Sequence, residues 1–136
     1  MKKLIAIIIS LMVLPNLSWG HSMSPGFEVE WAITPKFVKE YTITNATKHA
    51  SVFKISVYEK DWSEATGWEV QFDEYRINAD NKAIVKIRFD ASYKRKVYVC
   101  SSLTEIGKKG HETAIITRVC SRLIINAAPL KLKKEQ

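Results

Sequence analysis

The sequence predicts an all-β protein: a single immunoglobulin-like antiparallel β-sandwich of about seven strands that follows a cleaved signal peptide. Three observations lead to this prediction. Apolar residues recur at every second position in several short segments, polar turn-forming clusters separate the segments, and no segment has the period of an amphipathic helix. Many short strands without helices are typical of β-sandwiches.

Residues 1–20 have the plan of a secretory signal peptide. Lys2 and Lys3 supply the positive end, an apolar run extends from Leu4 to Leu14, and a short polar stretch ends at Gly20. The apolar run is shorter than the roughly 20 residues that span a bilayer. We therefore expect cleavage after Gly20, rather than a permanent membrane anchor, and export to the periplasm.

The remaining chain has the size of one domain. We expect the sandwich to occupy residues 21–132 and a basic, polar tail to occupy residues 133–136. Removing the two signal lysines lowers the formal net charge from +7 to +5, because 7 − 2 = 5. The remaining basic residues are scattered and not gathered into a nucleic-acid module, so we expect protein partners and neither nucleic acid nor a small-molecule substrate.

The first two predicted strands precede a polar turn. In residues 27–31, Phe27, Val29 and Trp31 alternate with two glutamates, which is the period of a half-buried strand. After Pro35, residues 37–44 form the next predicted strand, and residues 45–48 (NATK) read as a turn. This turn also fits a glycosylation sequon, which we discount because the lysine-led signal resembles a bacterial one.

Three more strands are predicted before the cysteines. Residues 52–58 alternate so that Phe53, Ile55 and Val57 should face the core. Residues 59–67 read as a loop anchored by Trp62, and residues 68–72 begin a further strand. Asp80-Asn81 is a turn signal, after which residues 83–89 form a strand with one apolar face. That face consists of Val85, Ile87 and Phe89.

The only two cysteines lie in a predicted antiparallel hairpin. Its arms span residues 96–103 and 113–125, with the polar loop 104–112 between them. Each arm carries one cysteine, Cys100 or Cys120, and an exported protein allows the two to form a disulfide. Closing a loop of this length stabilises a small domain by roughly 3 kcal/mol. The alternative, a metal pair, lacks both a CxxC spacing and a histidine ligand motif.

The sequence gives no support for catalysis. It contains no nucleophile elbow, no metal-ligand motif and no glycine-rich phosphate loop. Asp73 and Glu74 form a tempting acid pair, but neighbouring residues of a strand point to opposite faces and cannot converge on one substrate atom. We therefore expect a protein that is not an enzyme and needs no cofactor or metal.

Four stretches, in this order, resemble a known family. They are residues 42–45 (TITN), residues 77–87 (INADNKAIVKI), residues 97–100 (VYVC) and residues 120–125 (CSRLII). The last stretch is similar to the C-x-K-L pattern in the final strand of certain periplasmic pilus-assembly chaperones. The chain thus resembles the amino-terminal immunoglobulin-like domain of the chaperone-usher, PapD-like chaperones.

The resemblance implies a function and a set of partner-binding residues. Such chaperones lend their last strand to a pilus subunit that lacks one, and a cation at the base of that strand holds the subunit's terminal carboxylate. By this resemblance, Arg122 is the cation. The side chains donated to the partner would be those of Thr113, Ile115, Thr117 and Val119.

The chain departs from the family pattern in three ways. Two of the four donated residues are threonines, so the lent strand would bury less apolar area than large aliphatic residues do. Glu28 and Glu30 stand where the family has a second basic residue, and the chain ends at Gln136 without a second sandwich domain.

Two functions follow from the sequence. The first is a periplasmic pilus-assembly chaperone that binds partner subunits by strand complementation. The alternative is a non-catalytic structural or accessory component of a pilus or secretion machine in the cell envelope. The expected partners are a pilus or secreted subunit, an outer-membrane assembly platform, or a second copy of the chain.

Overall fold

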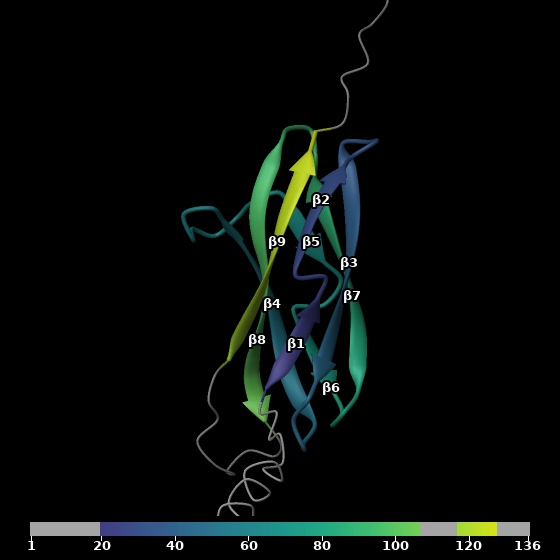
Figure 1. Ribbon diagram of the computed structural model, residues 1–136, viewed down its shortest axis with the longest axis vertical. Helices are drawn as coiled ribbons and strands as arrows, with labels where there is room; N and C mark the ends of the chain where they lie inside the picture. Colours follow the sequence, from purple (N-terminus) through teal and green to yellow (C-terminus); the bar gives the residue numbers. More distant parts are fainter. Residues whose placement is uncertain (1–19, 107–116, 128–136) are drawn as a thin grey trace, which may run out of the picture.

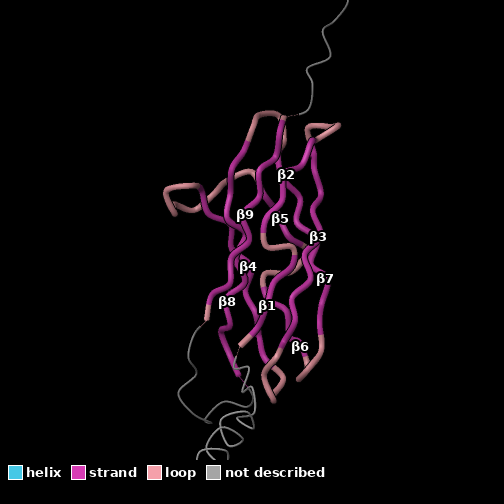
Figure 2. The backbone as a smooth tube through the Cα atoms, in the orientation of Figure 1, coloured by secondary structure: helices cyan, strands magenta, loops and turns pink. Residues whose placement is uncertain are grey.

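The computed structural model describes residues 20–106 and 117–127, and the regular structure within these ranges is all β-strand (Figure 2). None of the described residues forms a helix long and apolar enough to cross a membrane. The strands are β1 (His21–Ser24), β2 (Phe27–Trp31), β3 (Lys36–Asn45), β4 (Ser51–Glu59), β5 (Trp68–Val70), β6 (Glu74–Ile77), β7 (Lys82–Asp90), β8 (Arg95–Ile106) and β9 (Arg118–Asn126).

The strands form two sheets that pack face to face as a sandwich (Figure 1). The four-stranded sheet has the order β1-β3-β7-β5, and the five-stranded sheet has the order β2-β9-β8-β4-β6. All pairings between these strands are antiparallel except that of β2 with β9, which is parallel. The predicted sandwich is confirmed, and the described residues hold nine strands instead of about seven because β1 and β6 were not anticipated.

The amino-terminal segment belongs to both sheets. β1 pairs with β3 in the four-stranded sheet, and β2 pairs with β9 in the five-stranded sheet. The change of sheet takes place at Pro25 and Gly26, where proline has no N–H for a ladder and glycine resists regular strand structure. The carbonyl oxygens of both residues are used by β9: the Ser121 hydroxyl donates to that of Pro25, and the Arg122 N–H donates to that of Gly26.

The predicted core faces of the central strands are confirmed. Phe53, Ile55 and Val57 on β4 are buried, and so is the apolar face predicted for residues 83–89 on β7. From the hairpin, the core receives Val97, Val99, Leu103, Leu123 and Ile125. Burial of these branched and aromatic side chains between two sheets supplies the main stabilisation of the sandwich.

The strand predicted at residues 27–31 is confirmed as β2, but its apolar residues do not face the core. Phe27, Val29 and Trp31 face solvent, with exposed fractions of 56%, 50% and 74%. The two glutamates between them turn inward, because Lys39 of β3 donates to the carboxylates of both Glu28 and Glu30. A cation that is mostly removed from water requires such partners, so the ion cluster decides which face of β2 points inward.

The strand predicted to begin at residue 68 is shorter than expected. β5 ends at Val70, and Phe72 lies beyond it with an exposed side chain. β5 pairs only with β7 at the edge of the four-stranded sheet. β5 is therefore a short edge strand of three residues, and the chain then crosses to the five-stranded sheet, where it forms β6.

The predicted turn after β3 is built around a fully buried side chain. The Asn45 amide nitrogen donates to the carbonyl oxygens of His49 and Ile77, at 3.0 Å and 2.9 Å, and lies 3.2 Å from that of Asn78. Its carbonyl oxygen accepts from the backbone N–H and the hydroxyl of Thr47. Asn45 therefore fastens the β3–β4 turn to the β6–β7 turn, as a satisfied buried amide can.

Candidate functional site

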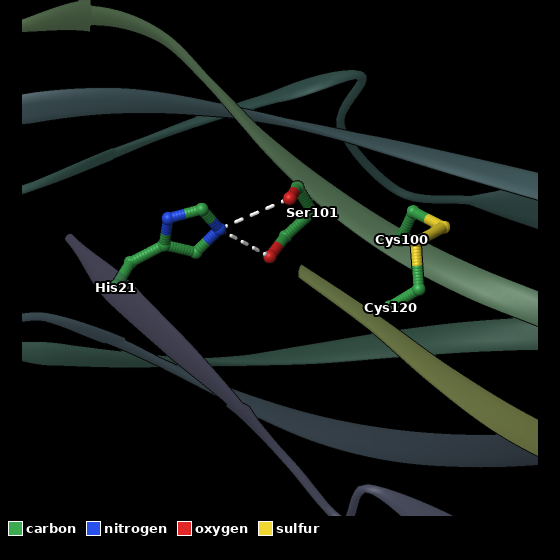
Figure 3. Close-up of a disulfide and its surroundings, with 4 residues drawn as sticks. All are labelled: His21, Cys100, Ser101 and Cys120. Atoms are coloured by element: carbon green, nitrogen blue, oxygen red, sulfur yellow. Dashed lines mark hydrogen bonds between the residues drawn. A yellow bond between two sulfur atoms is a disulfide. The ribbon is translucent and has the colours of Figure 1, made fainter. Parts of the chain in front are cut away.

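The predicted antiparallel pairing of the two cysteine-bearing arms and their disulfide are confirmed. β8 continues to Ile106, past the predicted start of the loop at residue 104, and residues 107–116 lie outside the described residues. β8 and β9 pair antiparallel in one continuous register from Arg95–Ile125 to Ser102–Arg118, and Cys100 stands directly opposite Cys120. Their sulfur atoms are bonded, and their Cα atoms are 4.0 Å apart (Figure 3). This short spacing marks a pair whose main-chain groups do not bond to each other, for which about 4.5 Å is usual.

The register shows where the main-chain groups of β9 point. The main-chain groups of Thr117 point toward β8, because the Thr117 carbonyl oxygen accepts a hydrogen bond from the Leu103 N–H at 2.9 Å. The main-chain groups of Arg122 point away from β8, because the Arg122 N–H donates to the Gly26 carbonyl oxygen. Residues of a strand alternate in this respect. The N–H and C=O groups of Arg118 and Cys120 therefore point away from β8, toward the edge of the sheet.

This edge is only partly covered. β2 pairs with β9 over residues 122–126 and stops there, because the chain before Pro25 belongs to the other sheet. Among the described residues, none pairs with residues 118–121 of β9 on the side away from β8. The amino-terminal half of β9 thus presents a short open edge with unpaired main-chain donors and acceptors, to which another strand can add.

The structure describes three of the five predicted partner-binding residues. Arg122 is exposed on the outer face of the five-stranded sheet, with its guanidinium carbon 5.7 Å from the centre of the Phe27 ring. Thr117 lies at the start of the open edge, and Val119 is half-buried and packs against the core. Thr113 and Ile115 lie outside the described residues.

A histidine that the sequence pattern did not single out lies beside the open edge (Figure 3). The His21 Nε2 atom lies 3.0 Å from the carbonyl oxygen of Ser101 and 2.9 Å from its hydroxyl, while Nδ1 lies 3.2 Å from the Thr117 hydroxyl. Burial lowers the pKa of His21, and the hydrogen bond with the Ser101 backbone opposes this effect. A single histidine that belongs to no ligand or catalytic motif cannot be recognised as a site residue from the sequence. Only the fold shows that His21 contacts Ser101 and Thr117.

The second basic residue of the family's carboxylate clamp has no counterpart on β2. Phe27 is the register partner of Arg122, and the neighbouring Glu28 turns inward to Lys39. Two lysines lie near Arg122 from other elements: Lys60, Lys96 and Arg122 line a small hollow together with Tyr98. No group of three His, Cys, Asp or Glu side chains among the described residues is placed to hold a metal ion.

No protein-family model matches the sequence, and no curated protein matches it. Solved structures do. A chain in the structure of the Salmonella enterica SafA pilin in complex with the SafB chaperone aligns with 84% of this chain at 15% identity and a TM-score of 0.67. The E. coli chaperone DraB aligns with 80% of this chain at 10% identity and a TM-score of 0.62.

The likeness extends over part of these proteins. The present chain covers 57% of the matched chain in the SafA–SafB complex and 55% of DraB, a little over half of each. WR4, an MSP family member from C. elegans, aligns with 77% of this chain at 12% identity and a TM-score of 0.58, and 96% of its own length is covered. At these identities the likeness concerns fold, and folds of this kind serve several functions. The chain therefore shares an immunoglobulin-like β-sandwich fold with these solved structures.

Proposed function

We propose that the protein is a periplasmic pilus-assembly chaperone-like protein that binds partner subunits by β-strand complementation. The single observation that carries the proposal is the open edge of β9. The main-chain groups of Arg118 and Cys120 point away from β8 and meet no strand among the described residues. A partner strand placed there extends the five-stranded sheet by hydrogen bonds that do not depend on the partner's sequence.

The side chains around this edge support a partner with a terminal carboxylate. Arg122 lies directly after the open edge, at the point where β2 takes over the pairing. It forms no ion pair with any described residue. An exposed guanidinium at the end of a strand-pairing groove suits a charge-assisted bond with a carboxylate. Thr113, Ile115, Thr117 and Val119 are the side chains proposed for the partner's groove. Of these, Val119 packs against the core of this chain in the structure and would have to leave it.

A backbone test separates strand pairing from side-chain contacts. Arg118→Pro removes an N–H that faces the open edge but keeps the bonds between β8 and β9, because proline is tolerated where a strand's N–H faces solvent. Arg118→Ala is the matched control, since it removes the side chain and keeps the N–H. We expect periplasmic partners to copurify with the wild type and with Arg118→Ala, but not with Arg118→Pro. Equal recovery with both variants would contradict strand complementation.

A peptide test addresses the carboxylate. The probe is a synthetic peptide with alternating apolar residues, prepared with either a free or an amidated carboxyl terminus. We expect the free form to bind more tightly, and Arg122→Glu to abolish that preference. Ile115→Asp should weaken both forms. Binding that ignores both substitutions would contradict the proposal.

One observation favours the second function, a structural or accessory component of an envelope machine. β2 is an edge strand whose apolar residues Phe27, Val29 and Trp31 are exposed together. A row of this kind suits a permanent neighbour better than solvent. Stoichiometric copurification with an assembled particle, and not with free subunits, would identify this role.

A further inference from the structure

Three aromatic side chains, two half-buried tyrosines and an exposed tryptophan, gather on the outer face of the five-stranded sheet. Tyr58 of β4 and Tyr98 of β8 are cross-strand neighbours. Trp62, from the turn after β4, stacks on Tyr98 with ring centres 4.4 Å apart and planes inclined by 7°. Its ring centre is 6.0 Å from that of Tyr58, and 52% of Trp62 is exposed. We call Tyr58, Trp62 and Tyr98 the aromatic platform.

The backbone holds Trp62 in this position against its own preference. Trp62 has a φ of 66°, in the left-handed region that glycine or asparagine normally occupies. The tight turn fixes this conformation: the Trp62 N–H donates to the Glu59 carbonyl, and the Glu59 N–H donates to the Ser63 carbonyl. A bulky aromatic residue at such a position is unfavourable for stability, and strained residues of this kind gather at binding sites.

Cations surround the aromatic platform. Lys60, Lys96 and Arg122 line a small hollow beside Tyr98, and the Arg118 guanidinium lies 5.1 Å from the centre of the Tyr58 ring. All four cations are exposed, and none forms an ion pair with a residue in the described ranges. Asp61, which lies between Lys60 and Trp62 in the sequence, pairs with none of these cations. Its carboxylate instead accepts hydrogen bonds from the N–H and the hydroxyl of Ser63 in the same turn.

On the outer face of the four-stranded sheet, only some of the exposed cations are paired. There, Lys86 pairs with Glu40 at 3.3 Å, and Arg88 pairs with Glu69 at 2.9 Å. Two other exposed cations of this face, Lys36 of β3 and Lys82 of β7, form no ion pair with a described residue. The aromatic platform differs from that face because four exposed cations, none of them in an ion pair with a described residue, lie around one aromatic cluster.

We propose that the aromatic platform and its four cations form a binding surface for an acidic polypeptide segment that carries an apolar side chain. The apolar side chain packs on the exposed face of Trp62, and flanking carboxylates meet Lys60, Lys96 and the two arginines. This surface lies on the face of the sheet, so it requires neither the main-chain edge of β9 nor a terminal carboxylate. A second copy of this chain is a poor occupant, because a symmetric contact through this surface brings like charges together.

The test uses short synthetic peptides with amidated carboxyl termini, so that terminal capture by Arg122 does not contribute. One peptide carries Asp and Glu around a single Leu, and its partner carries Asn and Gln in their place. Binding is measured by calorimetry and by the indole N–H resonance of Trp62, identified by its loss in Trp62→Gly. We expect the acidic peptide to bind, to weaken as salt is added, and to shift this resonance.

Two variants and one control complete the test. Trp62→Gly removes the ring and suits the left-handed backbone, so it should weaken binding by about tenfold without lowering the melting temperature by more than a few degrees. The double variant Lys60→Glu/Lys96→Glu should weaken binding by a similar factor. Lys36→Glu/Lys82→Glu, an equal double charge reversal on the outer face of the four-stranded sheet, should leave binding unchanged. Equal binding of the neutral peptide, or unchanged binding by either platform variant, would overturn the proposal.

Discussion

The two halves of β9 are held in the sheet by different means. The main chain of residues 122–126 pairs with β8 on one side and β2 on the other, whereas that of residues 118–121 pairs only with β8 among the described strands. The amino-terminal half instead has the disulfide from Cys120 to Cys100. The difference shows that a covalent link can secure a strand whose outer edge is open, because it fixes the strand without occupying its edge-facing hydrogen bonds.

The largest expected effect separates the two halves by their packing. Leu123 is fully buried, so Leu123→Ala should lower the free energy of unfolding by about 2–5 kcal/mol. Val119 is half-buried in the open half, and Val119→Ala should cost only about 1 kcal/mol. Urea denaturation of both variants measures the contrast. Similar losses would mean that the open half is packed as tightly as the covered half.

Removing the disulfide should loosen the open half first. The double variant Cys100→Ser/Cys120→Ser should lower the free energy of unfolding by about 3 kcal/mol, the value for closing a loop of this size. Hydrogen exchange should show greater loss of protection at residues 118–121 than at residues 122–126, because β2 still covers the latter. Uniform loss along β9 would show that the disulfide acts only on the unfolded chain.

Proline substitutions compare the two edges directly. The Ile124 N–H shares the direction of the Arg122 N–H, toward β2, so Ile124→Pro should break a ladder bond and cost about 1–3 kcal/mol. Arg118→Pro should cost about 0.5 kcal/mol or less, as for other exposed sites. Equal destabilisation in thermal unfolding would indicate that the edge at Arg118 is already paired in solution.

The smallest expected effect is a pH dependence of the free energy of unfolding, caused by His21 beside the first residues of β9. Burial holds the pKa of His21 below its ordinary value of 6.5, so the unfolded chain binds a proton more readily than the folded chain. The stabilisation is fully present above pH 6.5 and is lost as the pH falls toward the folded pKa. His21→Asn should flatten this part of the pH profile of urea midpoints. An unchanged profile would assign the dependence to other groups.

Alternation in the sequence predicted the central strands and their inward faces, because β4 and β7 are covered on one side along most of their length. Phe53, Ile55 and Val57 are examples. For residues 27–31 alternation predicted the strand but not its inward face, since a period of two shows which residues share a face but not which face meets the core. The inward face of β2 is the one whose two glutamates pair with Lys39, a residue of another strand, β3.

The site was predictable only in part, for a similar reason. Cysteine spacing between two β-rich arms was enough to predict the disulfide. The open edge depends on where the first strand changes sheets, and the residues of β1 show no apolar alternation that would announce a strand. The position of Trp62 depends on a left-handed backbone conformation that its residue type does not favour.

The buried amide of Asn45 has a practical consequence for producing this protein. Asn45-Ala46-Thr47 is an acceptor sequence for N-linked sugar, and eukaryotic secretory cells modify such sequences while the chain is still entering the secretory compartment. A glycan on that nitrogen would prevent the bonds to His49 and Ile77 and would have no room at a fully buried position. Material from such hosts should therefore misfold unless Asn45 escapes modification, and a bacterial host avoids the difficulty.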